Sequence, residues 1–168
     1  MRLRRALVLG CAVTLLLAAC GDDDDGDDES TDETSEQTLP GDEVDDVVAL
    51  TVASLTAAAE IPGPGQDGAT GTVDRLEITA TQVCVTMSVV GLDSPATAAH
   101  IHTGPSTAAG PPIVNFGAPA DAATGSWDTC VDADEATRSA IEQDPAGHYV
   151  NIHTEAYPNG AVRGQLTG

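Results

Sequence analysis

Three histidines have the spacing of metal ligands on neighbouring strands. His100 and His102 are two residues apart, and residues two apart on a β-strand point to the same face. In the segment 150–153 two aliphatic residues alternate with Asn151 and His153, so these two polar side chains also share a face. Neutral imidazole is a good ligand for copper and zinc. If the aliphatic residues fill a core, His100, His102 and His153 point outward and could hold one copper or zinc ion.

Two other interpretations of these histidines stay open. A hydrogen-bonded polar cluster that stabilises loops would use the same side chains, because histidines without cysteine or carboxylate partners are ambiguous. Redox catalysis would need, in addition, an open coordination position and tuned surrounding groups. Other catalytic signatures are missing from the sequence: no serine stands in a Gly-x-Ser-x-Gly setting, and there is no glycine-rich phosphate loop.

The segment after His153 predicts a β-hairpin. Pro158-Asn159-Gly160 suits a three-residue loop with glycine in the left-handed position, and this loop places Ile152 opposite Leu166 on the core face. A two-residue Asn-Gly turn would instead place His153 opposite Leu166 and mix the two faces. The alternation of apolar and polar residues along the two strands, here called hydrophobic phase, therefore favours the longer loop.

The same register predicts a row of polar side chains on the exposed face. It pairs His153 with Gln165, and it pairs Glu155 with Arg163, which predicts an ion pair. Asn151 lies on this face as well. We expect Asn151 and Gln165 to orient the histidines and Arg163 to lie beside them.

The elements that must position these residues are short strands. Apolar runs rich in valine and threonine are separated by glycine and proline, which predicts an antiparallel sandwich or barrel. One helix is expected after Asp132, where carboxylates could cap it and Glu135 completes a capping box; Pro145 and Gly147 end it. The candidate strands are Val48–Ala57, Ala69–Thr79, Gln82–Val90, Ala98–Thr103, Ile113–Phe116, Gly125–Val131, Tyr149–Glu155 and Ala161–Leu166.

Charge excludes one class of partner. The 168 residues include 27 acidic and 6 basic side chains, for a net charge of −21, and three of the six arginines lie within the first five residues. No basic patch remains to neutralise phosphates, so we expect no nucleic-acid partner. The one Phe, one Trp and two Tyr are too few for a base-stacking surface.

The first 20 residues resemble the signal of a bacterial lipoprotein. Arginines at the start precede an uncharged run, Ala6–Ala19, which is shorter than the ~20 apolar residues that span a bilayer. The run ends in Leu17-Ala18-Ala19-Cys20, which resembles a lipobox. That resemblance implies a signal peptide over residues 1–20, lipid on Cys20, and a protein anchored to the cell membrane on its extracytoplasmic face.

The chain after Cys20 divides into a tether and a domain. Residues 21–46 hold 14 of the 27 acidic residues and no basic one. Such a segment buries too little apolar surface to offset its chain entropy, so we expect a disordered acidic tether. Residues 47–168 are long enough for one hydrophobic core and form the expected domain.

Two cysteines fall in this domain. Cys84 and Cys130 lie on candidate strands, and in an oxidising compartment a disulfide is the default, with two free thiols as the alternative. Cys84 is out of phase with Val83 and Val85. The bridge is therefore expected on the outer face of its strand or under a loop.

Several motifs together resemble the CHRD domain, named for chordin. They are Ala99-His100-Ile101-His102-Thr103-Gly104, Gly-Pro-Pro-Ile-Val at 110–114, and Tyr149–Thr154 continuing through Arg163-Gly164-Gln165-Leu166. The resemblance covers about residues 48–167. It implies an all-β, immunoglobulin-like Greek-key sandwich, distantly similar to copper/zinc superoxide dismutase, and it brings no established activity.

The dismutase similarity bears on the histidines. His100, His102 and His153 fall where that enzyme has copper ligands, but nothing matches its bridging histidine or its zinc ligands, so a dinuclear site is not expected. We therefore expect a membrane-tethered, non-enzymatic binding module that holds copper or zinc, or binds a partner protein or an envelope polymer. A copper-dependent, dismutase-like oxidoreductase is the alternative.

Overall fold

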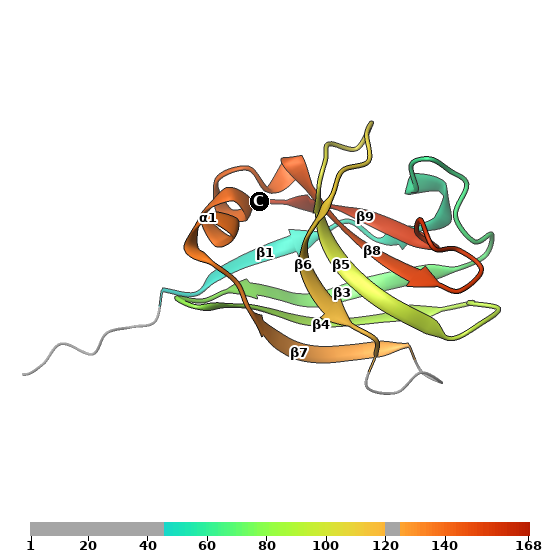
Figure 1. Cartoon of the computed structure of the whole chain (residues 1–168), viewed down its shortest axis with the longest axis horizontal. Coiled ribbons are helices and arrows are strands. Elements are labelled where there is room, and N and C mark those ends of the chain that lie inside the picture. The colour runs from blue at the N-terminus through green and yellow to red at the C-terminus, as the bar shows by residue number, and fades with distance from the viewer. Residues whose placement is uncertain (1–45, 120–124) are drawn as a thin grey trace, which may run out of the picture. The chain divides into compact units, whose positions relative to one another are not determined.

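The computed structural model describes residues 46–119 and 125–168 (Figure 1). The expected signal peptide, Cys20 and all but the last residue of the expected tether lie outside these ranges. The described part contains one α-helix, α1 (Glu135–Gln143), and two short 3-10 turns, Ala57–Ala59 and Pro145–Gly147. Its strands are β1 (Val48–Val52), β2 (Leu55–Thr56), β3 (Thr70–Ile78), β4 (Gln82–Val90), β5 (Ala96–Thr103), β6 (Pro112–Gly117), β7 (Ser126–Asp132), β8 (His148–Thr154) and β9 (Val162–Thr167).

The strands form two antiparallel layers. One layer has the order β6-β5-β8-β9 and the other the order β1-β3-β4-β7. The two are joined at β1, whose residues 48–50 pair with β3 and whose residues 51–52 pair with β9, and at the short strand β2, which also pairs with both β3 and β9. In Figure 1, β5 and β6 cross in front of β3 and β4. Strand β7 returns to pair with β4 after two strands in the other layer, which is a Greek-key crossover. The prediction of an all-β sandwich is confirmed.

Strand alternation builds the core between the layers. In β4, Val83, Val85, Met87 and Val89 are each at most 4% exposed. Ile101 of β5 and Ile152 of β8 are fully buried against them from the other layer, as their phase predicts. The helix contributes Ile141, also fully buried. Among the described residues, no helix is long and apolar enough to cross a membrane.

The disulfide Cys84–Cys130 is present, as predicted. The two residues face each other directly in β4 and β7, with their Cα atoms 4.0 Å apart. Because Val83 and Val85 point into the core, the bridge lies on the outer face of this layer. It links two strands that are neighbours in space but 46 residues apart in the chain.

Two local expectations, for the first strand and for the start of the helix, were wrong in detail. The first candidate strand is divided into β1 and β2. Asp134, one of the carboxylates expected to cap the helix, does so by accepting a hydrogen bond from the Thr137 amide at 2.7 Å, whereas the expected capping box of Asp132 and Glu135 is wrong. An aspartate in this position satisfies one of the free amides of the first helical turn, which explains why the helix begins at Glu135.

The β8–β9 hairpin has a longer loop than predicted. Ile152 pairs with Val162 rather than Leu166, a shift of four residues along β9. Two successive backbone turns, Thr154 to Tyr157 and Tyr157 to Gly160, take up the extra residues. Because the shift is an even number, every side chain stays on the face that hydrophobic phase assigned to it. The pairings expected for Glu155 and His153 were nevertheless wrong.

Candidate metal centre

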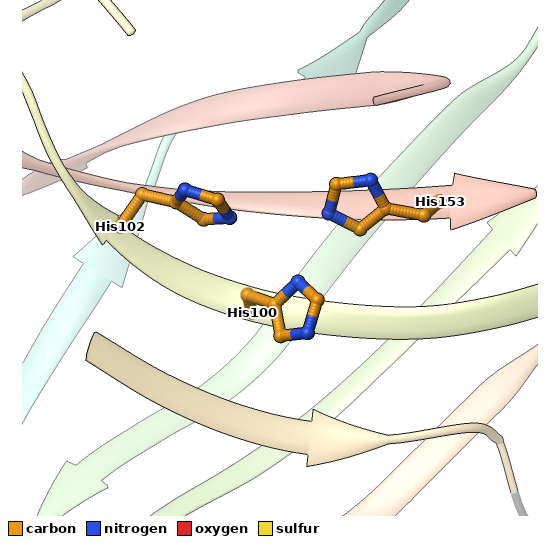
Figure 2. A group of neighbouring side chains, drawn as sticks. All are labelled: His100, His102 and His153. Carbon is orange, nitrogen blue, oxygen red and sulfur yellow. The ribbon is translucent and has the colours of Figure 1, made fainter. Parts of the chain in front are cut away.

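The structure brings His100, His102 and His153 together on the outer face of the β5–β8 pair (Figure 2). His100 lies directly opposite Asn151, and His153 is the next residue of β8 on the same face. One ring nitrogen from each histidine lies within 4.8 Å of the other two. Within residues 46–119 and 125–168, this is the one group of three or more histidine, cysteine or acidic side chains with such spacing.

The cluster is on the predicted face, but the expectation that it would be exposed was wrong. His102 and His153 are each only 8% exposed, and every residue of β8 is buried. Loops fold back over this face of the sheet. The loop after β5 approaches through Gly110, and the β8–β9 loop approaches through Pro158. Strand phase identifies the face, whereas loop paths decide whether water reaches it.

Backbone carbonyls fix the tautomers of two of the histidines. His102 Nδ1 lies 2.8 Å from the Gly110 oxygen, and His153 Nδ1 lies 3.0 Å from the Pro158 oxygen. A carbonyl oxygen only accepts, so each Nδ1 carries the hydrogen and each Nε2 keeps its lone pair. Metal-binding histidines in proteins commonly have this arrangement, because the second nitrogen's hydrogen bond orients the ring.

The remaining ring nitrogens are buried and unpaired. In the described part of the chain, His102 Nε2, His153 Nε2 and His100 Nδ1 make no hydrogen bond of ordinary geometry. The side chains of Asn151 and Asn115 lie close enough to His102 and His100 to favour the protonated rings. A buried polar atom without a partner costs about 1–3 kcal/mol. Three such nitrogens gathered at one point are the donor set that a single metal ion would satisfy.

Burial keeps these imidazoles neutral. Desolvation and, to a smaller extent, the charge of His100 lower the pKa of His153 to about 4, although the hydrogen bond to Pro158 opposes the shift. Desolvation also lowers the pKa of His100 and of His102; the hydrogen bond to Gly110 opposes the shift at His102. A neutral imidazole has a free lone pair, so the cluster is in its ligand form at neutral pH.

Arg163 supports the cluster through the loop after β5. It is 1% exposed, and its guanidinium donates to the carbonyl oxygens of Pro105 at 2.7 Å and Ala108 at 3.1 Å. The guanidinium also lies 3.5 Å from the centre of the Tyr149 ring. The predicted ion pair with Glu155 was wrong, because the shifted register places Arg163 opposite Asn151 and buries it.

Gln165 ties the same loop to the sheet. Its Nε2 donates to the carbonyl oxygens of Gly104 at 2.9 Å and His148 at 2.6 Å. Gln165 therefore acts on the loop rather than on a histidine ring. His148 itself lies apart from the cluster, with its Nδ1 donating to the Asp144 oxygen at 2.8 Å.

Two residues that contribute to the surroundings of the cluster were not predicted from the sequence. Tyr149 stacks on the His102 ring, with centroids 4.9 Å apart and planes 16° apart. Strand phase could have found it, since it precedes Asn151 by two residues. Glu60 is 5% exposed and its charge acts on Arg163; no local pattern links two residues so far apart in the chain.

Comparison with known families agrees with these motifs. The family model of the CHRD domain matches residues 51–166. The chain belongs to the CHRD domain family. The match runs from β1 to β9 and includes all three histidines of the cluster. No curated protein and no solved structure matches the chain significantly.

Proposed function

We propose that this CHRD domain is a non-enzymatic binding module that holds one copper or zinc ion on His100, His102 and His153. The observation that carries the proposal is the convergence of three buried ring nitrogens that have no partner within the described residues. Two of the three rings are already oriented by backbone carbonyls.

The ligand chemistry favours these metals over others. Three imidazoles with no carboxylate suit copper and zinc, whereas calcium and magnesium prefer oxygen ligands. The ligands lie on two paired strands, which are more rigid supports than loops. The nitrogens, which lie within 4.8 Å of one another, would have to move closer for all three to reach the ~2.0–2.1 Å of a metal–nitrogen bond, and rotation of the side chains on these fixed strands could supply that movement.

We also propose that the domain is held at the extracytoplasmic face of the cell membrane by lipid on Cys20. The support is the sequence Leu17-Ala18-Ala19-Cys20 after an uncharged run. The disulfide Cys84–Cys130 supports the same location, because such bridges persist in oxidising compartments.

Metal titration of the chain from Gly21 to Gly168 tests the binding site. Calorimetry with Cu(II) and Zn(II), against a competing chelator, should show one tight site. Changing any one of the three histidines to alanine should weaken it by about tenfold or more, since even residues outside the ligand set often cost 10–100-fold.

His148→Ala is the matched control and should bind as the unchanged chain does, because this ring lies outside the cluster. The triple His→Ala variant carries the same acidic segment and so corrects for weak cation binding there. Tight binding that persists in the triple variant would overturn the proposal, and so would no tight binding in the unchanged chain.

A further inference from the structure

A pocket of about 270 Å³ opens beside the histidine cluster. His102 and His153 form part of its wall, and Ile61, Pro62 and Pro158 form apolar sides. Tyr149 and Asn159 are the polar side chains besides the histidines. No acidic side chain is among the described residues that line it, although the chain as a whole carries a net charge of −21.

The proposed metal would have a free coordination position here. Copper and zinc sites with three protein ligands commonly take a further ligand from outside the protein. The described residues offer no fourth histidine, cysteine or carboxylate within reach of the three nitrogens. Two of the three ligands face the pocket, so a molecule in it could reach the metal.

Charge selects the kind of ligand. Three neutral imidazoles leave a divalent ion with its full positive charge, whereas a thiolate or carboxylate ligand would cancel part of it. His102 and His153 are 8% exposed, so this charge would be largely removed from water. Burying a charge is costly unless an opposite charge accompanies it.

Nearby protein charges do not supply that compensation. Arg163 adds positive charge close enough to act on His102. Glu60 is the carboxylate whose charge acts on Arg163, and it does not line the pocket. The pocket has room for a further ligand, because its volume is several times the ~30 Å³ of one water.

We propose that the metal-loaded centre takes one small monovalent anion from this pocket as a further ligand of the metal. This inference rests on the proposed metal site. The anion would cancel one of the two uncompensated charges of a divalent ion.

Azide is the probe, because it is small, monovalent and gives a charge-transfer absorption band when it binds Cu(II). The chain from Gly21 to Gly168 is loaded with one equivalent of Cu(II) and dialysed, and azide is titrated while visible absorption and electron paramagnetic resonance are recorded. A saturable band with one azide per copper is expected.

Ala109→Trp tests the route, since Ala109 lines the pocket, and Thr107→Trp is the matched control, since Thr107 is an exposed residue of the same loop that does not line it. Azide affinity should fall by about tenfold or more in Ala109→Trp, because a filled pocket leaves no room for the ligand. Azide affinity should be unchanged in Thr107→Trp, and copper affinity should be unchanged in both variants.

The outcomes separate the two proposals. Copper that binds tightly but gives no azide band overturns the anion site and leaves the metal site standing. The anion site is also overturned if added free imidazole, a neutral ligand, binds to the copper whereas azide does not. Equal azide affinity in both tryptophan variants overturns it as well. Failure of copper to bind at the histidines overturns the metal site, and the anion site with it.

Discussion

At the scale of single residues, burial determines how protons compete with a metal. A histidine in water loses ligand capacity as the pH falls through ~6.5. In this domain desolvation lowers the pKa of His153 to about 4 and lowers those of His100 and His102 as well. Protons therefore compete with the metal only at lower pH.

Zinc affinity should accordingly persist to lower pH than for imidazole ligands in water, and protonation of His153 should weaken it further toward about pH 4, because the folded state keeps the ligands unprotonated. Calorimetric titration of the chain at a series of pH values measures this. A loss of affinity centred near the value for free imidazole would contradict the burial of the cluster.

Titration of Glu60 makes the stability of the fold depend on pH, with a sign opposite to the effect of the histidines. Burial raises its pKa from 4.5 to about 7, while the charge of Arg163 and a hydrogen bond from the Ile61 amide oppose the rise. Between these two pH values the folded state binds more protons than the unfolded state, so its free energy of unfolding falls as the pH rises. A shift of this size corresponds to on the order of 3 kcal/mol.

Glu60→Gln should remove this dependence, because glutamine does not titrate. As the pH rises from about 4.5 to 7, the melting temperature of Glu60→Gln should rise relative to that of the unchanged chain. Taking the difference cancels the histidines, whose lowered pKa values make stability rise with pH over an overlapping range. Glu142→Gln, at an exposed position of α1, is the control. A constant difference across this range would show that Glu60 does not titrate there.

At the scale of the elements, strand phase was predictable and register was not. Alternation of aliphatic and polar residues placed the histidines, Asn151 and Arg163 on one face, and the structure agrees. The β8–β9 register was wrong by four residues, since any even shift keeps hydrophobic side chains inward. Only the hydrogen bonds of the loop distinguish these registers, and apolar periodicity carries no information about them.

The sequence could not predict that the face of the sheet that carries the three histidines is buried. It depends on where the loop after β5 lies, and that loop is held by contacts to β9 that span more than fifty residues. The contacts use the carbonyl oxygens of Pro105 and Ala108, which every residue type possesses. Side-chain patterns therefore cannot identify them.

Arg163 should be needed for the geometry of the metal site as well as for stability. Arg163→Lys keeps the charge but loses the planar group that donates to two carbonyls and stacks on Tyr149. The loop should loosen, and Gly110 should hold His102 less firmly. We expect faster amide hydrogen exchange in residues 104–110 and copper affinity lower by about tenfold, as for other residues that orient ligands.

Arg138→Lys is the matched control, because Arg138 lies on α1, away from the cluster. It should leave both copper affinity and the exchange of residues 104–110 unchanged. If Arg163→Lys lowers the melting temperature but leaves copper affinity intact, Arg163 stabilises the fold without positioning His102.

The disulfide stabilises the β4–β7 pair. Closing a chain segment of 46 residues contributes about 4 kcal/mol in the chain-entropy model. The double variant Cys84→Ala, Cys130→Ala should melt lower by about 10 °C, a large part of the stability of a domain this size. Calorimetry of the oxidised chain and the double variant measures the shift. Copper affinity should be unchanged, because the bridge lies on the other layer of the sandwich. Two titratable thiols in the unreduced chain would contradict the bridge.

At the scale of the whole molecule, negative charge is concentrated outside the domain. Residues 21–46 carry 14 of the 27 acidic side chains and no basic one. With lipid on Cys20, as proposed above, this acidic segment would lie between the anchor and the domain along the chain.

Cys20→Ala tests the proposed anchor. Without the cysteine of the Leu-Ala-Ala-Cys sequence, the lipoprotein pathway has no residue to acylate, and two or more acyl chains are what hold such a protein stably in a bilayer. The variant should carry no lipid by mass spectrometry and should leave the membrane fraction, or remain as an uncleaved precursor. Cys11→Ala, within the same expected signal, is the control and should be acylated and membrane-bound as before. If Cys20→Ala were still acylated and still sedimented with membranes, some other residue would hold the domain there.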